Sequence, residues 1–372
     1  MKKIKVITVV GTRPEIIRLS KVISHLDKNV NHIFVHTGQN YDYELNKIFF
    51  KDLNLRLPNY QVSLKKESSI SNINQIMLEV DKILKIEKPD AFVVLGDTNS
   101  CLSAYCAKRR KIPIFHIEAG NRCYDERVPE EINRKIIDHI SDVNITYSEI
   151  ARQNLIRENI HPDKVFKVGS PLSEVFKFYK KNIFKSNILK KYKLTKKNYF
   201  LISVHREENL DNDINFKKFI NLLRFLSENF NNKIIVSTHP RTMKKIDNLP
   251  IKNFKKIIFT KPFAYTDYIK LQMNAKIVMS DSGSITEEVS IINFPAINLR
   301  STNERQEGMN FGIVPMIHFD QTKIKSIIDT VKPVNKKITV TDYECTNFSK
   351  VFYNILISYI DYVKEYTWKS KN

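Results

Sequence analysis

Short apolar runs rich in β-branched residues alternate with amphipathic helical segments along almost the whole chain. This alternation is typical of βαβ units, in which helices join parallel strands and cover the sheet. Runs such as residues 92–95 are apolar throughout, which indicates burial on both faces of a sheet. The expected strands are residues 4–10, 32–36, 91–95, 112–117, 143–146, 164–168, 199–204, 233–237, 256–259, 276–279 and 296–299.

A basic, helix-prone stretch that begins at Pro171 interrupts the alternation once. Because 372 residues suit two domains of roughly 180 residues each, we predict an α/β protein with two doubly wound, Rossmann-like domains, residues 1–170 and 171–346. Ligands of such sheets bind beyond the carboxyl ends of the strands. The cleft between the domains is therefore the expected site.

Composition excludes several classes of protein. No run approaches the ~18 apolar residues of a membrane span, and the apolar stretch after the first lysines is too short for a signal peptide. We therefore predict a cytoplasmic protein with no membrane contact. The four cysteines form neither a disulfide framework nor, with the histidines, a zinc-ligand pattern. The net charge of +21 is compatible with nucleic-acid binding, but the lysines are dispersed and no nucleic-acid-binding motif accompanies them. A small anionic ligand such as a nucleotide fits the charge.

Polar and charged residues follow the expected strands of the first domain. Residues 11–15, Gly-Thr-Arg-Pro-Glu, close the first strand, and Arg13 and Arg18 near the next helix start form a candidate phosphate contact. The dinucleotide fingerprint is absent because its second and third glycines are missing. A tight turn with surface arginines is the alternative.

Carboxylates follow two neighbouring strands. Asp97 comes after residues 91–95 and Glu118 after residues 112–117, so both are expected in one crevice. Like charges close together raise the pKa of one group, as a general acid or base requires. Glu130 is a third candidate, at the start of a helix. A helix cap for Asp97 or Glu130, or a salt bridge for Glu118, explains each residue almost as well.

The second domain carries groups suited to phosphate and ribose. A histidine beside an arginine ends its first strand, a similar pair follows one unit later, and a small-residue turn precedes a helix N-terminus, where backbone amides bind phosphate well. The candidates are His205, Arg206, His239, Ser282, Gly283, Ser284, Glu287, Glu288, Arg300 and Arg305. Carboxylates in one domain and phosphate contacts in the other suit a nucleotide-linked substrate.

In order and spacing, these pieces resemble the UDP-N-acetylglucosamine 2-epimerase family over essentially the whole chain. The matching segments are residues 11–15, 96–98, 116–120, 129–134, 205–209 and 281–288. The resemblance implies the architecture of B-type glycosyltransferases, with a last helix at about 347–372 packing back on the first domain. It also implies a UDP-sugar substrate, a homodimer, and inversion at sugar C2 by elimination and re-addition of UDP, with no cofactor and no metal.

The resemblance also assigns roles to residues. Asp97, Glu118 and Glu130 match the catalytic carboxylates, and His205 matches a histidine that assists the departure of UDP. The residues implied to bind substrate are Arg13, Arg18, Gln39, Arg122, Arg134, Arg206, His239, Tyr268, Ser282, Gly283, Ser284, Glu288 and Arg305.

Departures from the family pattern concern the substrate. Residues 120–123 read Gly-Asn-Arg-Cys where Gly-Leu-Arg-Thr is common, and the loop to Pro129 is about two residues shorter. Both features are similar to the branch acting on UDP-2-acetamido-2,6-dideoxy-L-hexoses, which converts the L-talo to the L-fuco form or the L-rhamno to the L-quinovo form. We predict this activity, in capsule or O-antigen precursor synthesis. The alternatives are a UDP-N-acetylglucosamine 2-epimerase, a B-type glycosyltransferase, a UDP-sugar sensor and, from charge alone, a nucleic-acid binder.

Overall fold

The computed structural model describes residues 3–39, 43–65, 68–238, 240–247, 255–330 and 339–369. The chain divides into two compact units. Unit 1 contains Met1–Phe178 and Thr341–Asn372, and unit 2 contains Tyr179–Val340. The expected boundary at Pro171 is instead the first residue of helix α7 (Pro171–Lys185). The division between Phe178 and Tyr179 falls inside this helix. The helix continues past it because no glycine or proline interrupts residues 172–185.

Unit 1 contains a seven-stranded parallel sheet in the order β3-β2-β1-β4-β5-β6-β7. Its strands are β1 (Lys5–Val10), β2 (Asn31–His36), β3 (Tyr60–Gln61), β4 (Ala91–Leu95), β5 (Ile114–Ile117), β6 (Val143–Thr146) and β7 (Val165–Lys167). The strand order reverses direction between β1 and β4. In doubly wound sheets, ligands bind beyond the carboxyl ends of the strands at such a switch point.

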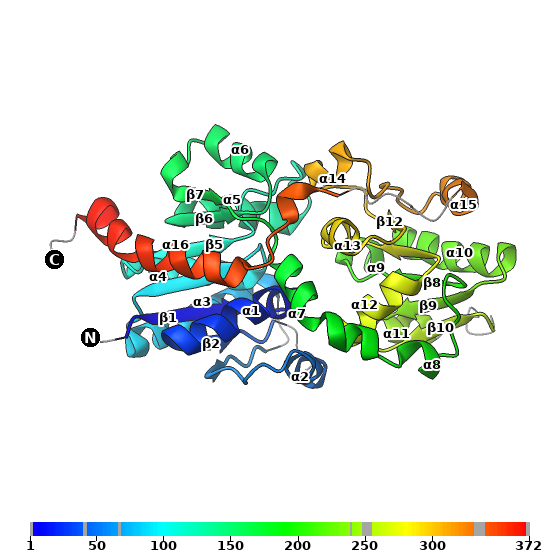
Figure 1. The fold of residues 1–372 in the computed structure, drawn as a ribbon, viewed down its shortest axis with the longest axis horizontal. Helices are drawn as coiled ribbons and strands as arrows, with labels where there is room; N and C mark the ends of the chain where they lie inside the picture. The colour runs from blue at the N-terminus through cyan, green and yellow to red at the C-terminus, as the bar shows by residue number, and fades with distance from the viewer. Residues whose placement is uncertain are drawn as a thin grey trace. The chain divides into compact units, whose positions relative to one another are not determined.

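Helices cover this sheet, and the end of the chain returns to it. The helices are α1 (Arg13–Asn29), α2 (Tyr43–Asp52), α3 (Ser69–Glu87), α4 (Ala104–Arg109), α5 (Pro129–Ile140), α6 (Glu149–Arg157) and α16 (Phe348–Tyr362), with short turns η1 (Asn99–Ser103), η2 (Pro162–Lys164), η4 (Thr341–Tyr343) and η5 (Val363–Thr367). Helix α16 packs against α1, as Figure 1 shows, and its Phe352 ring meets Phe115 of β5 edge-on at 6.3 Å.

Unit 2 repeats the design with five parallel strands in the order β10-β9-β8-β11-β12. The strands are β8 (Tyr199–Ser203), β9 (Lys233–Ser237), β10 (Ile257–Thr260), β11 (Ile277–Ser280) and β12 (Ala296–Asn298). The helices are α8 (Ile188–Lys191), α9 (Glu207–Leu210), α10 (Asp213–Asn229), α11 (Pro240–Asp247), α12 (Tyr265–Asn274), α13 (Ile285–Ile292), α14 (Gln306–Asn310) and α15 (Gln321–Thr330). The switch point of this sheet lies between β8 and β11.

The predicted fold class is confirmed. Each expected strand has an observed counterpart, because buried apolar runs flanked by turn residues are a strong signal. Strand β3 and helix α2 were not expected. Strand β3 has only two residues, too few for any periodicity.

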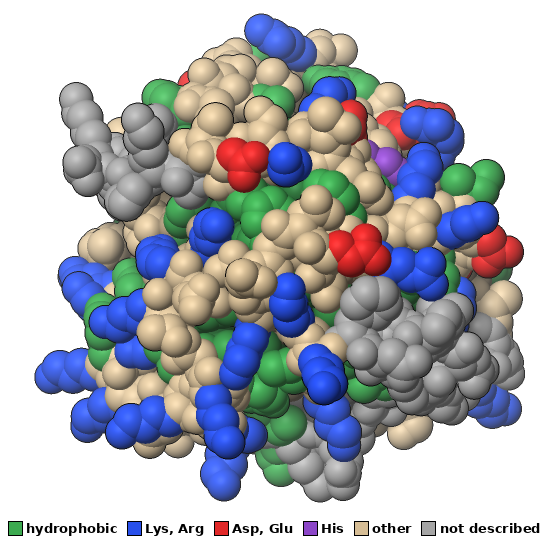
Figure 2. All heavy atoms as spheres, turned by 90° about the vertical axis from the view of Figure 1, so that its right-hand side faces the viewer, with side chains coloured by type: hydrophobic (Ala, Val, Ile, Leu, Met, Phe, Trp, Pro, Cys, Tyr) green, Lys and Arg blue, Asp and Glu red, His purple; other side chains and the backbone are tan. Residues whose placement is uncertain are grey.

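Two observations concern membrane proteins and nucleic-acid binders, the classes that composition argued against. Within the described residues, no helix is both long and apolar enough to cross a membrane. Figure 2 shows one face of the molecule, on which Lys and Arg side chains are spread among polar and apolar ones, with a few carboxylates between them.

Candidate active site

The turns after β1, β4 and β5 share one edge of the unit 1 sheet and have unusual backbone geometry. Gly96, directly after β4, has φ +71°, and Glu118, directly after β5, has φ +73°. A left-handed conformation is uncommon for a residue with a side chain, and such strain gathers at functional sites. At the end of β1, a Cβ on Gly11 would lie 2.0 Å from Ser100 Oγ, so only glycine fits there.

Asp97 is held by an arginine of α5. Nε and Nη2 of Arg134 each lie 2.7 Å from Asp97 Oδ2, and Asn133 Nδ2 donates to the Asp97 carbonyl at 2.8 Å. Arg134 is 4% exposed as a side chain, whereas Asp97 is 28% exposed. The buried arginine therefore holds the carboxylate in place and leaves part of it accessible to solvent.

Glu118 has its own arginine partner. Nη1 of Arg18, on α1, forms an ion pair with Glu118 Oε2, and both side chains are largely buried. We expected repulsion between Asp97 and Glu118 to set their chemistry. Each carboxylate instead has a guanidinium partner that holds it in place.

The first turn of α5 contains two glutamates in different environments. Glu130 is half-buried. Glu131 is fully buried and accepts hydrogen bonds from the Cys123 and Tyr124 backbone N–H groups at 3.1 and 3.0 Å and from Arg134 at 2.8 Å. Burial alone would raise the pKa of Glu131, but these donors hold it below its ordinary value. Glu131 thus anchors the loop that precedes α5, which leaves Glu130 as the candidate for chemistry.

Arg122, which we expected to bind substrate, has several partners inside unit 1. This side chain is buried, and it donates to Glu158 through Nε and Nη2 at 2.8 and 2.6 Å and to Asp138 through Nη1 at 2.7 Å. Asp138 also accepts from the Gly120 N–H and contacts His116 Nδ1 at 2.9 Å, while His116 Nε2 donates to the Gly96 carbonyl. These contacts make Arg122 a support of the turns after β4 and β5, and its contact with substrate stays a prediction.

The turn after β1 carries the remaining unit 1 candidates. Arg13 is half-buried, with its guanidinium 5.8 Å from the centre of the Phe49 ring. Gln39 Oε1 accepts from Ser100 Oγ at 3.2 Å. Glu15, which the sequence analysis did not single out as a site residue, accepts from the Thr12 N–H at 2.7 Å and from Thr98 Oγ1 at 3.2 Å. It therefore links the turn after β1 to the turn after β4.

In unit 2, His205 and Asp281 meet at the switch point between β8 and β11. His205 Nδ1 lies 2.9 Å from Asp281 Oδ1. Arg206 is half-buried, with Nη2 3.7 Å from Glu304 Oε1. His239, which we expected to repeat this arrangement, lies outside the described residues.

The turn between β11 and α13 presents small polar groups. Ser282 Oγ and Ser284 Oγ are 2.9 Å apart, and Ser284 Oγ donates to Glu288 Oε1 at 2.8 Å. Glu288 Oε2 accepts from Gln272 Nε2 at 2.6 Å, and Tyr268 bonds to Gln272. Burial, with a smaller contribution from the Glu288 charge, raises the pKa of Tyr268, so this phenol stays neutral.

Arg305 lies beneath this turn. Its Nη2 is 2.5 Å from Glu287 Oε1, its Nε donates to the Gly283 carbonyl at 3.4 Å, and both charged side chains are buried. Glu304 lies so close that a Cβ on Gly283 would be 2.0 Å from its Oε1. These contacts make Arg305 a support of the turn, and its expected contact with UDP stays a prediction.

The chain has relatives among known proteins. A family model described as UDP-N-acetylglucosamine 2-epimerase matches residues 24–351. The chain belongs to this family. It is 36% identical over 348 residues to the UDP-N-acetylglucosamine 2-epimerase of Methanocaldococcus jannaschii, covering 90% of this chain and 93% of the relative.

Solved structures of family members cover nearly the whole chain. A UDP-N-acetylglucosamine 2-epimerase structure from Rickettsia bellii has a TM-score of 0.91 and 48% identity, covering 99% of this chain and 100% of that one. The Methanocaldococcus jannaschii enzyme in complex with UDP-GlcNAc and UDP has a TM-score of 0.88 and 34% identity, covering 95% of this chain and 100% of that one.

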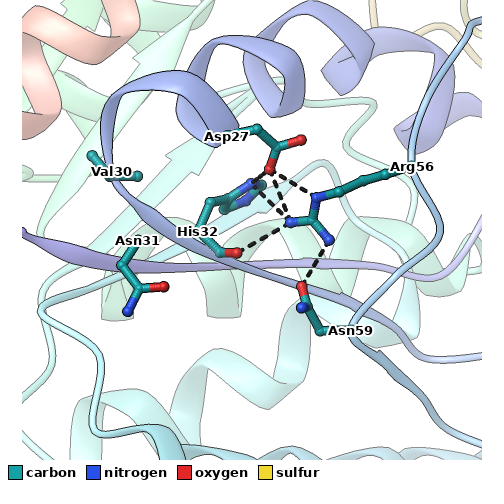
Figure 3. Close-up of a pocket in the computed structure, with 6 residues that line it drawn as sticks. All are labelled: Asp27, Val30, Asn31, His32, Arg56 and Asn59. Atoms are coloured by element: carbon teal, nitrogen blue, oxygen red, sulfur yellow. Dashed lines mark hydrogen bonds and ion pairs between the residues drawn. The ribbon is translucent and has the colours of Figure 1, made fainter.

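One pocket lies away from the site of this family member, at the amino end of β2. Figure 3 shows Asp27, His32, Arg56 and Asn59 pointing toward one another. Asp27 Oδ1 lies 2.6 Å from His32 Nδ1 and accepts from Arg56 Nε at 3.0 Å, so these charges are satisfied within the unit. Among the described residues, no group of three or more His, Cys, Asp and Glu side chains is arranged to hold a metal ion.

Sequence reasoning missed the buried residues that support the candidate site. Glu15, Asp138 and Asp281 each accept from several donors, and all three are nearly inaccessible. The sequence shows the motifs that contain these residues. A charged residue at a strand end is nevertheless expected to face solvent unless its partners are known. A signal was available for Asp281, because it directly follows an apolar strand, as Asp97 nearly does.

Proposed function

We propose that this chain inverts C2 of a UDP-2-acetamido sugar without hydrolysing it. A base removes the C2 proton while the bond between C1 and the diphosphate oxygen breaks, and its electron pair leaves with UDP. UDP then adds back to C1 of the resulting glycal, and a proton reaches the opposite face of C2. The family membership and the paired carboxylates of unit 1 support this reaction.

The observation that carries the proposal is the pair of carboxylates at the ends of β4 and β5. Asp97 and Glu118 follow neighbouring strands, are held by Arg134 and Arg18, and remain partly exposed. The C2 proton beside an acetamido group is weakly acidic, so removing it needs a positioned base. Two carboxylates, with Glu130 as a third, can serve the removal and the return of the proton on opposite faces.

Unit 2 supplies groups for UDP in this proposal. Ser282, Gly283 and Ser284 precede α13, where backbone N–H groups and hydroxyls favour a phosphate. Glu288, at the first turn of α13, has the oxygens that ribose hydroxyls need, and the Tyr268 ring belongs to the same cluster through Gln272. His205 supplies a donor to the diphosphate.

Two substrates have support. The names of the relatives favour UDP-N-acetylglucosamine. The short loop of residues 121–128, which Glu131 and Arg122 anchor, resembles that of the branch acting on UDP-2-acetamido-2,6-dideoxy-L-hexoses, and this resemblance favours such a substrate. We propose the 6-deoxy-L-hexose and keep UDP-N-acetylglucosamine as the second candidate.

Proton NMR in D₂O tests both the reaction and the substrate. The purified protein is incubated separately with UDP-N-acetylglucosamine and with UDP-2-acetamido-2,6-dideoxy-L-talose. Deuterium at C2 of the 6-deoxy sugar alone, together with a new epimer, is the expected result. Exchange in the glucosamine compound alone keeps the reaction and moves the substrate to the second candidate. Absence of exchange in these two sugars and in the L-rhamno compound contradicts the epimerase proposal and favours a transferase or a sensor.

We also propose that the chain forms a homodimer through unit 1. Helix α4 contacts both α3 and α5, and these helices expose large apolar side chains, which is unusual for a free surface. The exposed residues are Ile70, Leu78, Ile86, Tyr105, Ile132 and Ile136. Light scattering of the Leu78→Asp, Ile86→Asp double variant should give a monomer. Phe311→Asp, an equally exposed site in unit 2, should leave the dimer intact.

A further inference from the structure

Asp281 is a buried carboxylate at the end of β11 that faces the turn between β8 and α9. Its side chain is inaccessible to solvent. Its oxygens accept from the backbone N–H groups of His205 at 3.1 Å and Arg206 at 3.0 Å and from Asn209 Nδ2 at 3.0 Å. One carboxylate therefore fixes both the backbone that carries His205 and, through Oδ1, the imidazole itself.

The charge on Asp281 determines which imidazole nitrogen carries hydrogen. Burial alone would raise its pKa, but His205 and the donors of Asn209 and Arg206 lower the pKa of Asp281 to about 2. An ionised carboxylate only accepts hydrogen bonds. The nitrogen 2.9 Å from Oδ1 must then be a donor, so neutral His205 carries its hydrogen on Nδ1.

The other imidazole nitrogen remains available. The His205 side chain is 44% exposed, and the contacts of the described residues give Nε2 no hydrogen-bond partner. In this tautomer, Nε2 of neutral His205 is an acceptor, and protonated His205 becomes a donor at Nε2 beside a fixed negative charge. The same carboxylate–imidazole logic orients and stabilises catalytic histidines on unrelated folds.

We infer that Asp281 is a positioning residue that holds His205 with its Nδ1 hydrogen toward the carboxylate, so that Nε2, once it has taken a proton from water, donates a hydrogen bond to the oxygen of the departing UDP diphosphate. This inference rests on the proposed function for its chemical meaning. The hydrogen bond from Nε2 strengthens as the bond between C1 and oxygen breaks, because negative charge then develops on that oxygen. It weakens again when UDP re-adds, so the histidine ends the cycle as it began.

The tautomer is measurable without any substrate. ¹⁵N NMR of histidine-labelled protein reports which nitrogen carries hydrogen, and His205→Gln assigns the His205 signal among the nine histidines. The expected wild-type form is Nδ1–H. In Asp281→Asn, the amide oxygen must serve the three donors of His205, Arg206 and Asn209, so the amide N–H₂ faces Nδ1. This arrangement reverses the tautomer to Nε2–H.

Kinetics separate positioning from folding. Asp281→Asn should lower kcat about 10²–10⁴-fold, while UDP affinity by calorimetry changes only a few-fold. In a His205→Gln background, Asp281→Asn should lower kcat little further, because the effects of substituting two residues that act as a unit do not add. Asn209→Ala, which removes another bond to the same carboxylate, should keep the Nδ1–H tautomer.

Three outcomes would overturn the inference: a wild-type Nε2–H tautomer, an unchanged kcat in Asp281→Asn, or losses that multiply in the double variant. If Asp281→Asn does not fold, the wild-type tautomer decides alone. A chain that epimerises no UDP-sugar yet shows the Nδ1–H tautomer contradicts the proposed function and leaves the hydrogen-bond geometry standing.

Discussion

Arg134 contacts Asp97 with two nitrogen atoms, Nε and Nη2, each 2.7 Å from the same carboxylate oxygen. Its third nitrogen, Nη1, donates to Glu131 at 2.8 Å, and Glu131 in turn holds the backbone of the loop before α5. One buried arginine thus connects a candidate catalytic carboxylate to the loop before α5. The sequence of this loop is the feature from which we predicted the substrate. Its planar guanidinium cannot be replaced by the point charge of a lysine.

Arg134→Lys should therefore impair catalysis although it keeps the charge. We expect kcat to fall by up to about 10²-fold, because Asp97 loses one of two contacts and shifts, while UDP affinity stays the same. The measurement is C2 deuterium exchange together with calorimetry. Lys135→Arg is the matched control, since the Lys135 side chain is 42% exposed and forms an ion pair with Glu126, away from Asp97. An Arg134→Lys enzyme within twofold of wild type would contradict the positioning role.

Replacement of Glu118 should separate stability from activity. At φ +73°, alanine is strained and glycine is not, so Glu118→Gly should be more stable than Glu118→Ala by about 1 kcal/mol in urea unfolding. Both variants should lose C2 exchange. In helix α4, Ala107→Gly should show the opposite sign, a loss of more than about 1 kcal/mol, because glycine lowers helix propensity and also removes a buried methyl group. If the glycine variant is less stable than the alanine form at both position 118 and position 107, the left-handed backbone strain at Glu118 is absent.

Glu15 should make stability depend on pH. Burial raises its pKa from 4.5 to about 7, despite hydrogen bonds from Thr12, Gly11 and Thr98 that lower it. The folded chain then binds more protons than the unfolded chain between pH 4.5 and 7, so the free energy of unfolding falls as pH rises through that window, by up to about 3 kcal/mol.

The Glu15→Gln variant tests this expectation. Glutamine can accept from the Thr12 N–H and donate to Thr98, so its unfolding free energy should lack that decline. Urea unfolding at pH 4.5, 6 and 8 measures the difference between the variant and the wild type. Glu79→Gln, at a side chain that is 46% exposed and paired with Lys82, should keep the wild-type slope. Equal slopes in wild type and Glu15→Gln would assign the pH dependence to other groups.

Gly283→Ala should weaken UDP binding. A Cβ would lie 2.0 Å from Glu304 Oε1, and Glu304 is held by Arg300 at 2.6 Å, so the turn before α13 must move. We expect at least about a tenfold loss of UDP affinity by calorimetry, equivalent to 1.4 kcal/mol. Gly312→Ala is the control: its Cβ meets nothing within 4 Å, but its φ of +60° should lower stability without changing UDP affinity. Unchanged UDP binding in Gly283→Ala would remove this turn from the UDP site.

Local patterns were enough to predict the elements and the edge of each sheet where polar groups gather. The apolar runs before Asp97 and Glu118 identified two neighbouring strands, and proline at the start of α5 identified a helix beginning at Pro129. These signals extend over a few residues, so tertiary structure did not alter them. The resemblance to a known family named the candidate chemistry from the same short segments.

The partners of the charged residues needed the fold. Arg18 and Glu118 are 100 positions apart, and Arg122 turns inward to Asp138 and Glu158 although its neighbours suggested a substrate contact. A long charged side chain can point to solvent, to substrate or to a buried carboxylate, and only the packed structure brings one of these within hydrogen-bond distance. The amino-acid sequence by itself therefore determined two parallel α/β sheets with reactive groups at their strand ends. The tertiary structure decided which of those groups pair in the interior and which remain exposed, because a buried arginine meets a carboxylate only where folding brings the two side chains within hydrogen-bond distance.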